Sequence, residues 1–369
     1  MDIHVVSFNV PWPADYGGVI DVYYRVKALS EMGVRVHLHC YTYGREEAEE
    51  LRKICEEVCY YERETGICSQ FGRRPYIVES RRSEVLIERL KKDNYPILLE
   101  GLHNGYVLER LHGCGRMIMV RAHNVEHEYY AQLAQAEQKR WKKLFFKIES
   151  CKLKRYEKVL KMATTVLAIS EKDAAHFVEI GCKQVEVLPP SHGHGEVCSL
   201  LGRGDYVLYH GNLSVPENES AALFLIKEVF DGSPYELTIA GRNPSKRLER
   251  EAGMHKNIKL VANPDDATMR QLLQNAHINM LVTGQATGVK LKLMNALYEG
   301  RHCLVNSAMV AGTGLEKACW IADTAEEMKK VLGNLAAKEF GERERSERIA
   351  MLEALDMRRE LEKIIMNNE

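Results

Sequence analysis

No hydrophobic run in the sequence approaches the roughly 20 residues that a membrane-spanning helix requires. The first residues, MDIHVVSF, lack the basic start and the cleavage site of a secretory signal peptide. The 10 cysteines include no CxxC pair and no cysteine–histidine ligand spacing. The i, i+4 pair Cys55 and Cys59 predicts two buried thiols on a helix. We therefore expect a reduced, cytoplasmic protein with no metal and no cofactor.

An excess of charge of either sign is also missing. The 51 Lys and Arg residues balance 52 Asp and Glu residues, which leaves a formal charge of −1. This balance argues against a nucleic-acid-binding field over the whole chain. The 369 residues are 45% apolar, which is enough for two domains of about 150–200 residues, each with its own core.

Short apolar runs alternate with helical stretches, a pattern typical of parallel sheets with crossover helices. A first helix carries Val22, Val26 and Leu29 on one face and ends at Gly33, and a long helix is expected from about Glu126 to Met162. Ser170 and Asp173 are interpreted as a helix cap. The strands expected in the first half of the chain are Ile3–Phe8, Val34–Tyr41, Pro96–Glu100, Arg116–Arg121, Thr164–Ile169 and Val185–Leu188.

A Pro- and Gly-rich stretch at 189–195 interrupts this rhythm and is typical of a domain junction. Ser214 and Glu217 then predict a capping box at the start of a helix. The last 30 residues predict a charged amphipathic helix whose apolar stripe must dock on a core. The strands expected in the second half are Tyr206–Tyr209, Glu236–Ala240, Asn257–Val261, Ile278–Val282 and His302–Asn306.

The loops that follow the strands must identify the ligand, because such folds bind ligands at the carboxyl ends of their strands. No loop carries GxGxxG, a Walker Gly-Lys-Thr/Ser or GxSxG. The sequence therefore lacks the usual signatures of dehydrogenases, P-loop kinases and GxSxG hydrolases. The strand Ile278–Val282 runs into TGQATGVKLKLMNA, where Thr287 is a sound N-cap. Free N–H groups and Lys290 in the first turn suit a phosphate, whereas Lys292 points about 200° away around the helix. A capped helix with two solvated lysines stays an open alternative.

This strand, small-residue loop and GVKLKLMNALYEG segment resembles the donor-binding signature of the GT-B glycosyltransferases of retaining family 4. The resemblance extends over nearly the whole chain in the expected order. It includes the Gly17–Gly18 loop, an Ile-Ser-x-x-Asp helix start ending at Asp173, and three further stretches, HGNLSVPEN from His210, LTIAGR from Leu237 and VAGTGLE from Val310.

The resemblance implies an α/β fold of two Rossmann-like doubly wound domains that face each other across a cleft. The N-terminal acceptor domain would span 1–190, the hinge 191–204 and the donor domain 205–340. A C-terminal helix at 341–369 would cross back to complete the first domain.

The resemblance also implies site residues, with His103 and Lys290 as catalytic candidates and His123 and Asn124 on the acceptor side. Thr287 and Asn295 stand where the family commonly has a Glu pair, so a role of the first carboxylate is lost or moved. For His123 and Asn124 a capped helix start, with Asn124 as N-cap, stays an alternative. The donor-binding candidates are Gly17, Gly18, Asn212, Arg242, Thr287, Gly288, Val289, Lys290, Asn295 and Gly314.

The segment 139–161 carries ten basic residues against Glu149 and Glu157, with Trp141 and other apolar residues interleaved. Such a helix favours an anionic membrane surface, in which case the protein would be peripheral at the inner face of the plasma membrane. A solvated outer helix whose apolar side chains reach the core is the alternative.

By resemblance, we expect a retaining, metal-independent hexosyltransferase of cell-surface polysaccharide synthesis. It would move a sugar from a nucleotide-diphosphate donor to a glycan or a lipid-linked acceptor, and no nucleic acid would be bound. Two alternatives remain open at this point: a non-catalytic sugar-nucleotide-binding partner protein, and a sugar-nucleotide epimerase.

Overall fold

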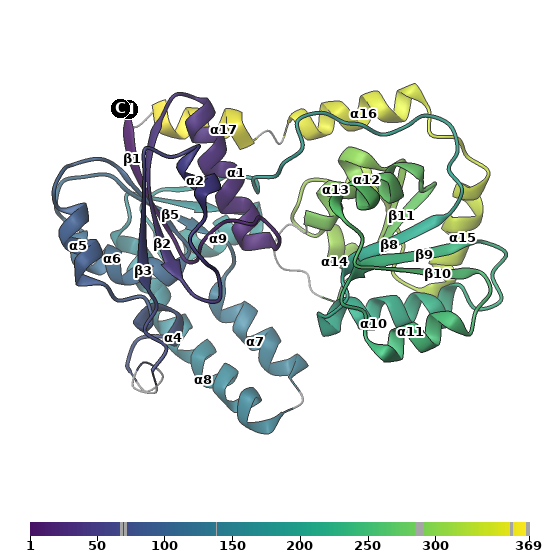
Figure 1. The fold of residues 1–369 in the computed structure, drawn as a ribbon, viewed down its shortest axis with the longest axis horizontal. Coiled ribbons are helices and arrows are strands. Elements are labelled where there is room, and N and C mark those ends of the chain that lie inside the picture. Colours follow the sequence, from purple (N-terminus) through teal and green to yellow (C-terminus); the bar gives the residue numbers. More distant parts are fainter. Residues whose placement is uncertain (67–68, 70–71, 138, 285–290, 355–356, 367–369) are drawn as a thin grey trace. The chain divides into compact units, whose positions relative to one another are not determined.

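The computed structural model describes residues 1–66, 69, 72–137, 139–284, 291–354 and 357–366 (Figure 1). The chain divides into two compact units, which are described separately. Unit 1 comprises Met1–His192 and Met357–Glu369, and unit 2 comprises Gly193–Asp356.

Unit 1 contains a seven-stranded parallel sheet with the strand order β3-β2-β1-β4-β5-β6-β7. Neighbouring strand residues alternate between two core layers: Val5 and Leu98 face one layer, and Val6 and Leu99 face the other. Both faces are therefore covered, which explains why the strands read as continuous apolar runs. The strands are β1 (Asp2–Ser7), β2 (Arg35–Thr42), β3 (Glu57–Glu62), β4 (Ile97–Glu100), β5 (Ile118–Ala122), β6 (Thr165–Ala168) and β7 (Val185–Val187).

The helices of unit 1 connect these strands. Ser170 caps α9, because its Oγ accepts a hydrogen bond from the backbone N of Asp173, as expected for a helix cap. The helical segments are α1 (Gly17–Glu31), α2 (Glu49–Arg52), α4 (Tyr76–Glu79), α5 (Glu84–Leu90), η1 (Leu102–Asn104), α6 (Gly105–Leu111), α7 (Glu126–Ala136), α8 (Arg140–Tyr156), η2 (Glu157–Met162), α9 (Glu171–Glu179) and α17 (Met357–Met366).

The prediction of one long helix from Glu126 to Met162 is wrong. The segment forms a hairpin in which α7 and α8 lie side by side (Figure 1). Tyr130 and Phe146 meet edge to face with their centroids 5.9 Å apart, and Ser150 Oγ donates to the carbonyl of His127 over 2.8 Å. The turn lets the two helices bury apolar side chains against each other, which a helical period alone does not reveal.

The helix expected around Cys55 and Cys59 is also wrong. Cys59 lies on β3, where it and Tyr61 are buried and alternate with more exposed neighbours. A period of two and pairing with β2 outweigh the i, i+4 spacing of the two thiols.

Unit 2 contains a six-stranded parallel sheet with the order β10-β9-β8-β11-β12-β13. Its strands are β8 (Val207–Asn212), β9 (Leu237–Arg242), β10 (Ile258–Ala262), β11 (Ile278–Leu281), β12 (His302–Val305) and β13 (Trp320–Ile321). Its helical segments are α10 (Pro216–Phe224), η3 (Leu225–Val229), α11 (Lys246–Gly253), α12 (Asp266–Asn275), α13 (Leu291–Glu299), α14 (Ser307–Val310), η4 (Glu316–Ala318), α15 (Ala325–Ala336) and α16 (Glu342–Glu353).

The capping box predicted at Ser214 and Glu217 is not formed. The N-cap of α10 is Val215, and the hydroxyl of Ser214 donates to Asn212 Oδ1 over 2.7 Å instead. Pro216 at the first helical position has no N–H to satisfy, so a side-chain cap is needed less.

The single helix expected over 341–369 is two helices. In unit 2, Arg348 of α16 donates to the carbonyls of Gly300 and Leu297 and to the hydroxyl of Ser199. In unit 1, α17 places Leu361 and Ile364 in the core, as its apolar stripe predicted. Among the described helices, none is both long and apolar enough to cross a bilayer.

Candidate active site

Each sheet reverses its strand order once, between β1 and β4 in unit 1 and between β8 and β11 in unit 2. The carboxyl ends of strands at such a reversal form the usual ligand site of doubly wound sheets. The predicted residues Gly17 and Gly18 follow β1, His103 follows β4, and His123 and Asn124 follow β5. The predicted donor residues Thr287, Gly288, Val289 and Lys290 lie outside the described residues.

A buried ionic network occupies this edge of unit 1. Glu100, the last residue of β4, accepts from Arg25 Nε over 2.8 Å, and Asp21 accepts from Arg25 over 2.6 Å. Asp21 also accepts from Arg121 Nε over 3.1 Å and from the backbone N of Ser191 over 2.6 Å. Asp21 and Arg25 are one turn apart on α1, so both reach under the ends of β4 and β5.

His123 completes the network. Its Nδ1 lies 3.2 Å from Asp21 Oδ2 and its Nε2 lies 2.9 Å from Glu100 Oε2. Burial disfavours a charged imidazole, but the hydrogen bonds to Asp21 and Glu100 outweigh it and raise the pKa of His123 above its ordinary value. Two carboxylates and two guanidinium groups balance each other, so a protonated His123 leaves one net positive charge at the edge of the sheet.

Sequence reasoning found His123 but assigned no role to the four charged residues of its network, of which Asp21 and Glu100 contact the ring. A signal was present in α1, where Asp21 and Arg25 directly precede the apolar positions Val22 and Val26. Charged residues beside a buried stripe are paired when they are buried. Which acids and bases meet is nevertheless not readable from spacing, because Asp21 and Arg121 are 100 positions apart.

His103 has a different environment. Its ring stacks on Phe8 at 5.1 Å, and burial holds the pKa of His103 well below its ordinary value, so the imidazole is neutral at pH 7. Within the described part of the chain, its Nδ1 has no hydrogen-bond partner. A Cβ built on Gly18 would lie 2.8 Å from Phe8 Cζ, so the glycine loop packs through Phe8 onto His103.

Asn124 does not cap a helix, contrary to the alternative reading of this segment. The N-cap of α7 is Val125, whose side chain makes no capping hydrogen bond, and the first-turn N–H of His127 donates instead to Glu157 Oε1 over 3.2 Å. Asn124 instead lines a small cavity together with Glu126 and Glu157. Burial raises the pKa of Glu126 to about 7, and the nearby Glu157 adds to the effect.

In unit 2, Lys292 lies at the predicted donor edge. Its Nζ donates to Asn218 Oδ1 over 3.0 Å and lies over the ring of Tyr209, 5.5 Å from the centroid. Asn218 in turn donates to the carbonyl of Asn212 over 3.0 Å, and Asn212 is the register partner of Arg242 on β9. The sequence analysis assigned no role to Lys292, which the structure links to Asn212 through Asn218.

The other two predicted donor residues lie on separate segments of unit 2. Asn295 of α13 contacts His194, whose Nε2 is 2.9 Å from Asn295 Oδ1 and whose ring stacks on Tyr298. Gly314 lies in the exposed loop after α14 with φ of +73°, a backbone conformation that favours glycine.

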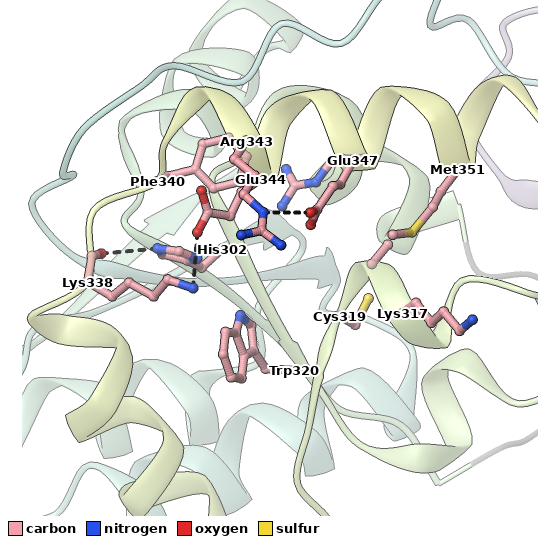
Figure 2. A pocket seen from close by; sticks show the side chains of 12 residues that line it. His302, Lys317, Cys319, Trp320, Lys338, Phe340, Arg343, Glu344, Glu347 and Met351 are labelled. Carbon is pink, nitrogen blue, oxygen red and sulfur yellow. Dashed lines mark hydrogen bonds and ion pairs between the residues drawn. The ribbon is translucent and has the colours of Figure 1, made fainter.

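A cavity of about 530 Å³ in unit 2 is lined by none of the predicted donor-binding residues. Figure 2 shows Trp320, Lys338 and Arg343 around it, together with His302, the first residue of β12. His302 places the cavity at the amino ends of the strands. It is therefore at the sheet edge opposite to the one that binds ligands in such folds.

No family model matches the chain. An uncharacterized 44.6 kDa protein in the cps region of Klebsiella pneumoniae is 28% identical over 333 residues, which cover 85% of this chain and 84% of that protein.

Solved structures resemble the chain over its whole length. The UDP-forming α,α-trehalose-phosphate synthase of Burkholderia xenovorans has a TM-score of 0.66 and 10% identity, with all of both chains covered. The lipopolysaccharide outer core galactosyltransferase WaaB has a TM-score of 0.65, 11% identity and full coverage of both chains. The Anabaena protein HepE, solved with UDP and glucose, has a TM-score of 0.65 and 11% identity over 99% of each chain. At these identities the similarity establishes the fold, which is GT-B with two Rossmann-like domains, as predicted.

Proposed function

We propose that the protein is a retaining, metal-independent hexosyltransferase of cell-surface polysaccharide synthesis. It moves a sugar from a nucleotide-diphosphate donor to a hydroxyl of a glycan or a lipid-linked acceptor. The observation that carries the proposal is His123, an imidazole held by Asp21 and Glu100 at the carboxyl edge of the first sheet of a GT-B fold. The resemblance to the family 4 signature and the relative from a cps region support the same reaction class.

On the donor side, Lys292 provides a positive charge beside Asn218 and Asn212 at the end of β8. Negative charge develops on the diphosphate as the bond to the sugar breaks, and fixed cations and N–H dipoles stabilise it without a divalent ion. Lys290 and the turn before it remain part of this proposal.

On the unit 1 side, a protonated His123 contributes a positive charge that favours an anionic or sugar oxygen of a substrate bound at this edge of the sheet, while its own two N–H groups face Asp21 and Glu100. The carboxylates of Asp21 and Glu100 hold the ring in one orientation, because each ring nitrogen faces one of them. The neutral His103 accepts a hydrogen bond from a sugar or acceptor hydroxyl.

A non-catalytic sugar-nucleotide binder is the second candidate. Asn295 replaces a family Glu, and its Oδ1 already contacts His194. An epimerase needs an ionised carboxylate available to the sugar, whereas Asp21 and Glu100 are both paired with arginine.

Binding and turnover separate these candidates. A thermal-shift panel of UDP, GDP and dTDP should show a stabilising ligand, and Lys292→Ala should weaken its binding about 10–100-fold because a charge-assisted hydrogen bond is lost. Lys329→Ala, an exposed lysine on α15, is the control. If no nucleotide stabilises the protein, or if Lys292→Ala binds as tightly as the wild type, the donor assignment is wrong.

The turnover assay then measures release of nucleoside diphosphate from the matching nucleotide sugar, without added Mg²⁺ or Mn²⁺. His123→Gln should abolish a slow release that the wild type shows. Binding without any release by the wild type, with or without a panel of acceptors, identifies a binder. Conversion of the free sugar nucleotide into its epimer identifies the epimerase.

We also propose that α8 contacts an anionic membrane surface. Trp141, Leu144 and Ile148 are 68, 59 and 48% exposed and follow i, i+3, i+7 spacing, so they form one exposed apolar stripe with lysines and arginines beside it. Phe145 and Phe146 pack inward against Tyr76 and Tyr130. Each basic residue near such a surface contributes about 1 kcal/mol.

Vesicle flotation tests this contact. The full chain should bind vesicles of equimolar phosphatidylcholine and phosphatidylglycerol and should not bind pure phosphatidylcholine. The double variant Trp141→Ala/Leu144→Ala should lose most of this binding. The control replaces Val85 and Val178, two exposed valines of unit 1, with Ala. Equal binding by both double variants would refute the contact.

A further inference from the structure

Three metal-ligating side chains converge at the base of the α7–α8 hairpin, away from the His123 network. His127 comes from the first turn of α7, Glu157 from the first turn of η2 and His176 from α9. His127 Nδ1 lies 2.8 Å from Glu157 Oε2, and His176 Nε2 lies 3.2 Å from the same oxygen. The possible ligand atoms of all three residues lie within 4.8 Å of one another.

The surrounding charge distinguishes this cluster from the other group of similar composition, Asp21, Glu100 and His123. In that group Arg25 and Arg121 already provide two positive charges to the carboxylates. Glu157 is 2% exposed, and within the described part of the chain it makes no ion pair with Lys or Arg.

A second buried carboxyl group stands beside Glu157. Glu126 is 4% exposed and lines the same small cavity as Glu157. Two acidic groups therefore share a buried region. The Arg81 guanidinium acts on Glu126, whereas the ion pairs of Glu157 within the described part of the chain are with histidines. Buried charges are normally paired or coordinate a metal, so this region favours a bound cation.

The donor set matches zinc. Two imidazole nitrogens and one carboxylate oxygen are ligands that Zn²⁺ accepts, and three protein ligands leave a fourth position for water. The side chains of His127 and His176 are 13 and 22% exposed, so solvent reaches the cluster while the carboxylate stays covered.

We propose that His127, Glu157 and His176 form a zinc site with water as the fourth ligand. The metal ties both ends of the α7–α8 hairpin to α9, because the ligands come from the start of α7, the residue just after α8 and the middle of α9. It thereby stabilises the start of α7, three residues after His123. The proposed effect of the metal is on the stability of this hairpin, and it does not depend on the proposed sugar transfer.

The competing interpretation is a hydrogen-bonded cluster in which both imidazoles donate N–H groups to Glu157. It needs no metal and predicts that zinc has no effect. The experiment dialyses the full chain against zinc, removes free metal and measures the bound zinc by mass spectrometry. The wild type should retain one zinc that His176→Gln does not retain, and EDTA should release it. His112→Gln, an exposed histidine of the same unit, should retain the metal.

A second measurement keeps the test valid if a variant folds poorly. Zinc at about 100 times its Kd should raise the Tm of the wild type by about 5–10 °C and leave the Tm of His176→Gln unchanged. Co²⁺ bound to the wild type should give the visible absorption of a four-coordinate site. Retention of the same amount of zinc by wild type and His176→Gln, or no retention by either, overturns the proposal whatever the outcome of the transferase assay.

Discussion

Replacement of Glu100 by Gln tests whether the ionic network sets the protonation of His123. The change removes the negative charge 2.9 Å from His123 Nε2 and leaves Asp21 as the remaining carboxylate on the ring. A hydrogen bond to a charged group contributes about 1.5–3 kcal/mol, and one pKa unit corresponds to 1.36 kcal/mol. The pKa of His123 should therefore fall by about 1–2 units.

The same change alters how stability depends on pH. Because the pKa of His123 is raised in the folded protein, its contribution is fully present below the unfolded value of about 6.5 and is lost as the pH rises through the folded pKa. In Glu100→Gln this loss should shrink or reverse sign. Removing one partner of the buried Arg25–Glu100 pair should also cost up to about 3–5 kcal/mol at pH 7.

NMR titration of the histidine Cε1–H signals measures the pKa directly, and any unfolded fraction appears as separate resonances. Glu88→Gln, which removes an exposed acid on α5, is the control and should leave the titration of His123 unchanged. A His123 midpoint at or below about 6.5 in the wild type would refute the reasoning. So would a midpoint that is the same in Glu100→Gln and the wild type.

Three further predictions concern packing, and thermal or urea denaturation checks each of them. Gly18→Ala should cost about 1–3 kcal/mol, because the new Cβ would lie 2.8 Å from Phe8 Cζ; an unchanged Tm would contradict this contact. Leu361→Ala should cost about 2–5 kcal/mol and speed proteolysis within α17, which is anchored in the core of unit 1 through this residue. Arg348→Met should cost at least about 1–3 kcal/mol, because the carbonyls of Leu297 and Gly300 lose a buried donor, and no loss of stability would show that these bonds contribute little.

Eleven of the strands were predictable, because each contains a short, mainly apolar run bounded by turn residues. The exceptions show what such runs leave undetermined. Cys59 on β3 has a spacing that fits a helix with Cys55, and the turn between α7 and α8 interrupts a helical period without any glycine or proline. In both places long-range packing overrides the local signal.

The candidate site was predictable in part for a similar reason. Loops after strands are recognisable, so His103, His123 and Asn212 could be named from their positions at strand ends together with the family resemblance. The contacts of Lys292 could not be predicted from the sequence. Helical geometry shows that Lys292 points away from Lys290, but it does not show which residues Lys292 faces. Its contacts with Asn218 and Tyr209 depend on how α13 packs against β8.

The amino-acid order by itself determined the alternation of strands and helices and the loops that reach the ligand edge, because these follow from local apolar patterns, and its loop motifs carried the GT-B resemblance. The tertiary structure decided which charges meet. Asp21 joins Arg121 over 100 positions, and His127 joins Glu157 and His176 from three separate segments. Such contacts arise when strand order and helix packing bring residues together that are far apart in the sequence. The spacing of residues along the chain does not show which of them will meet in the fold.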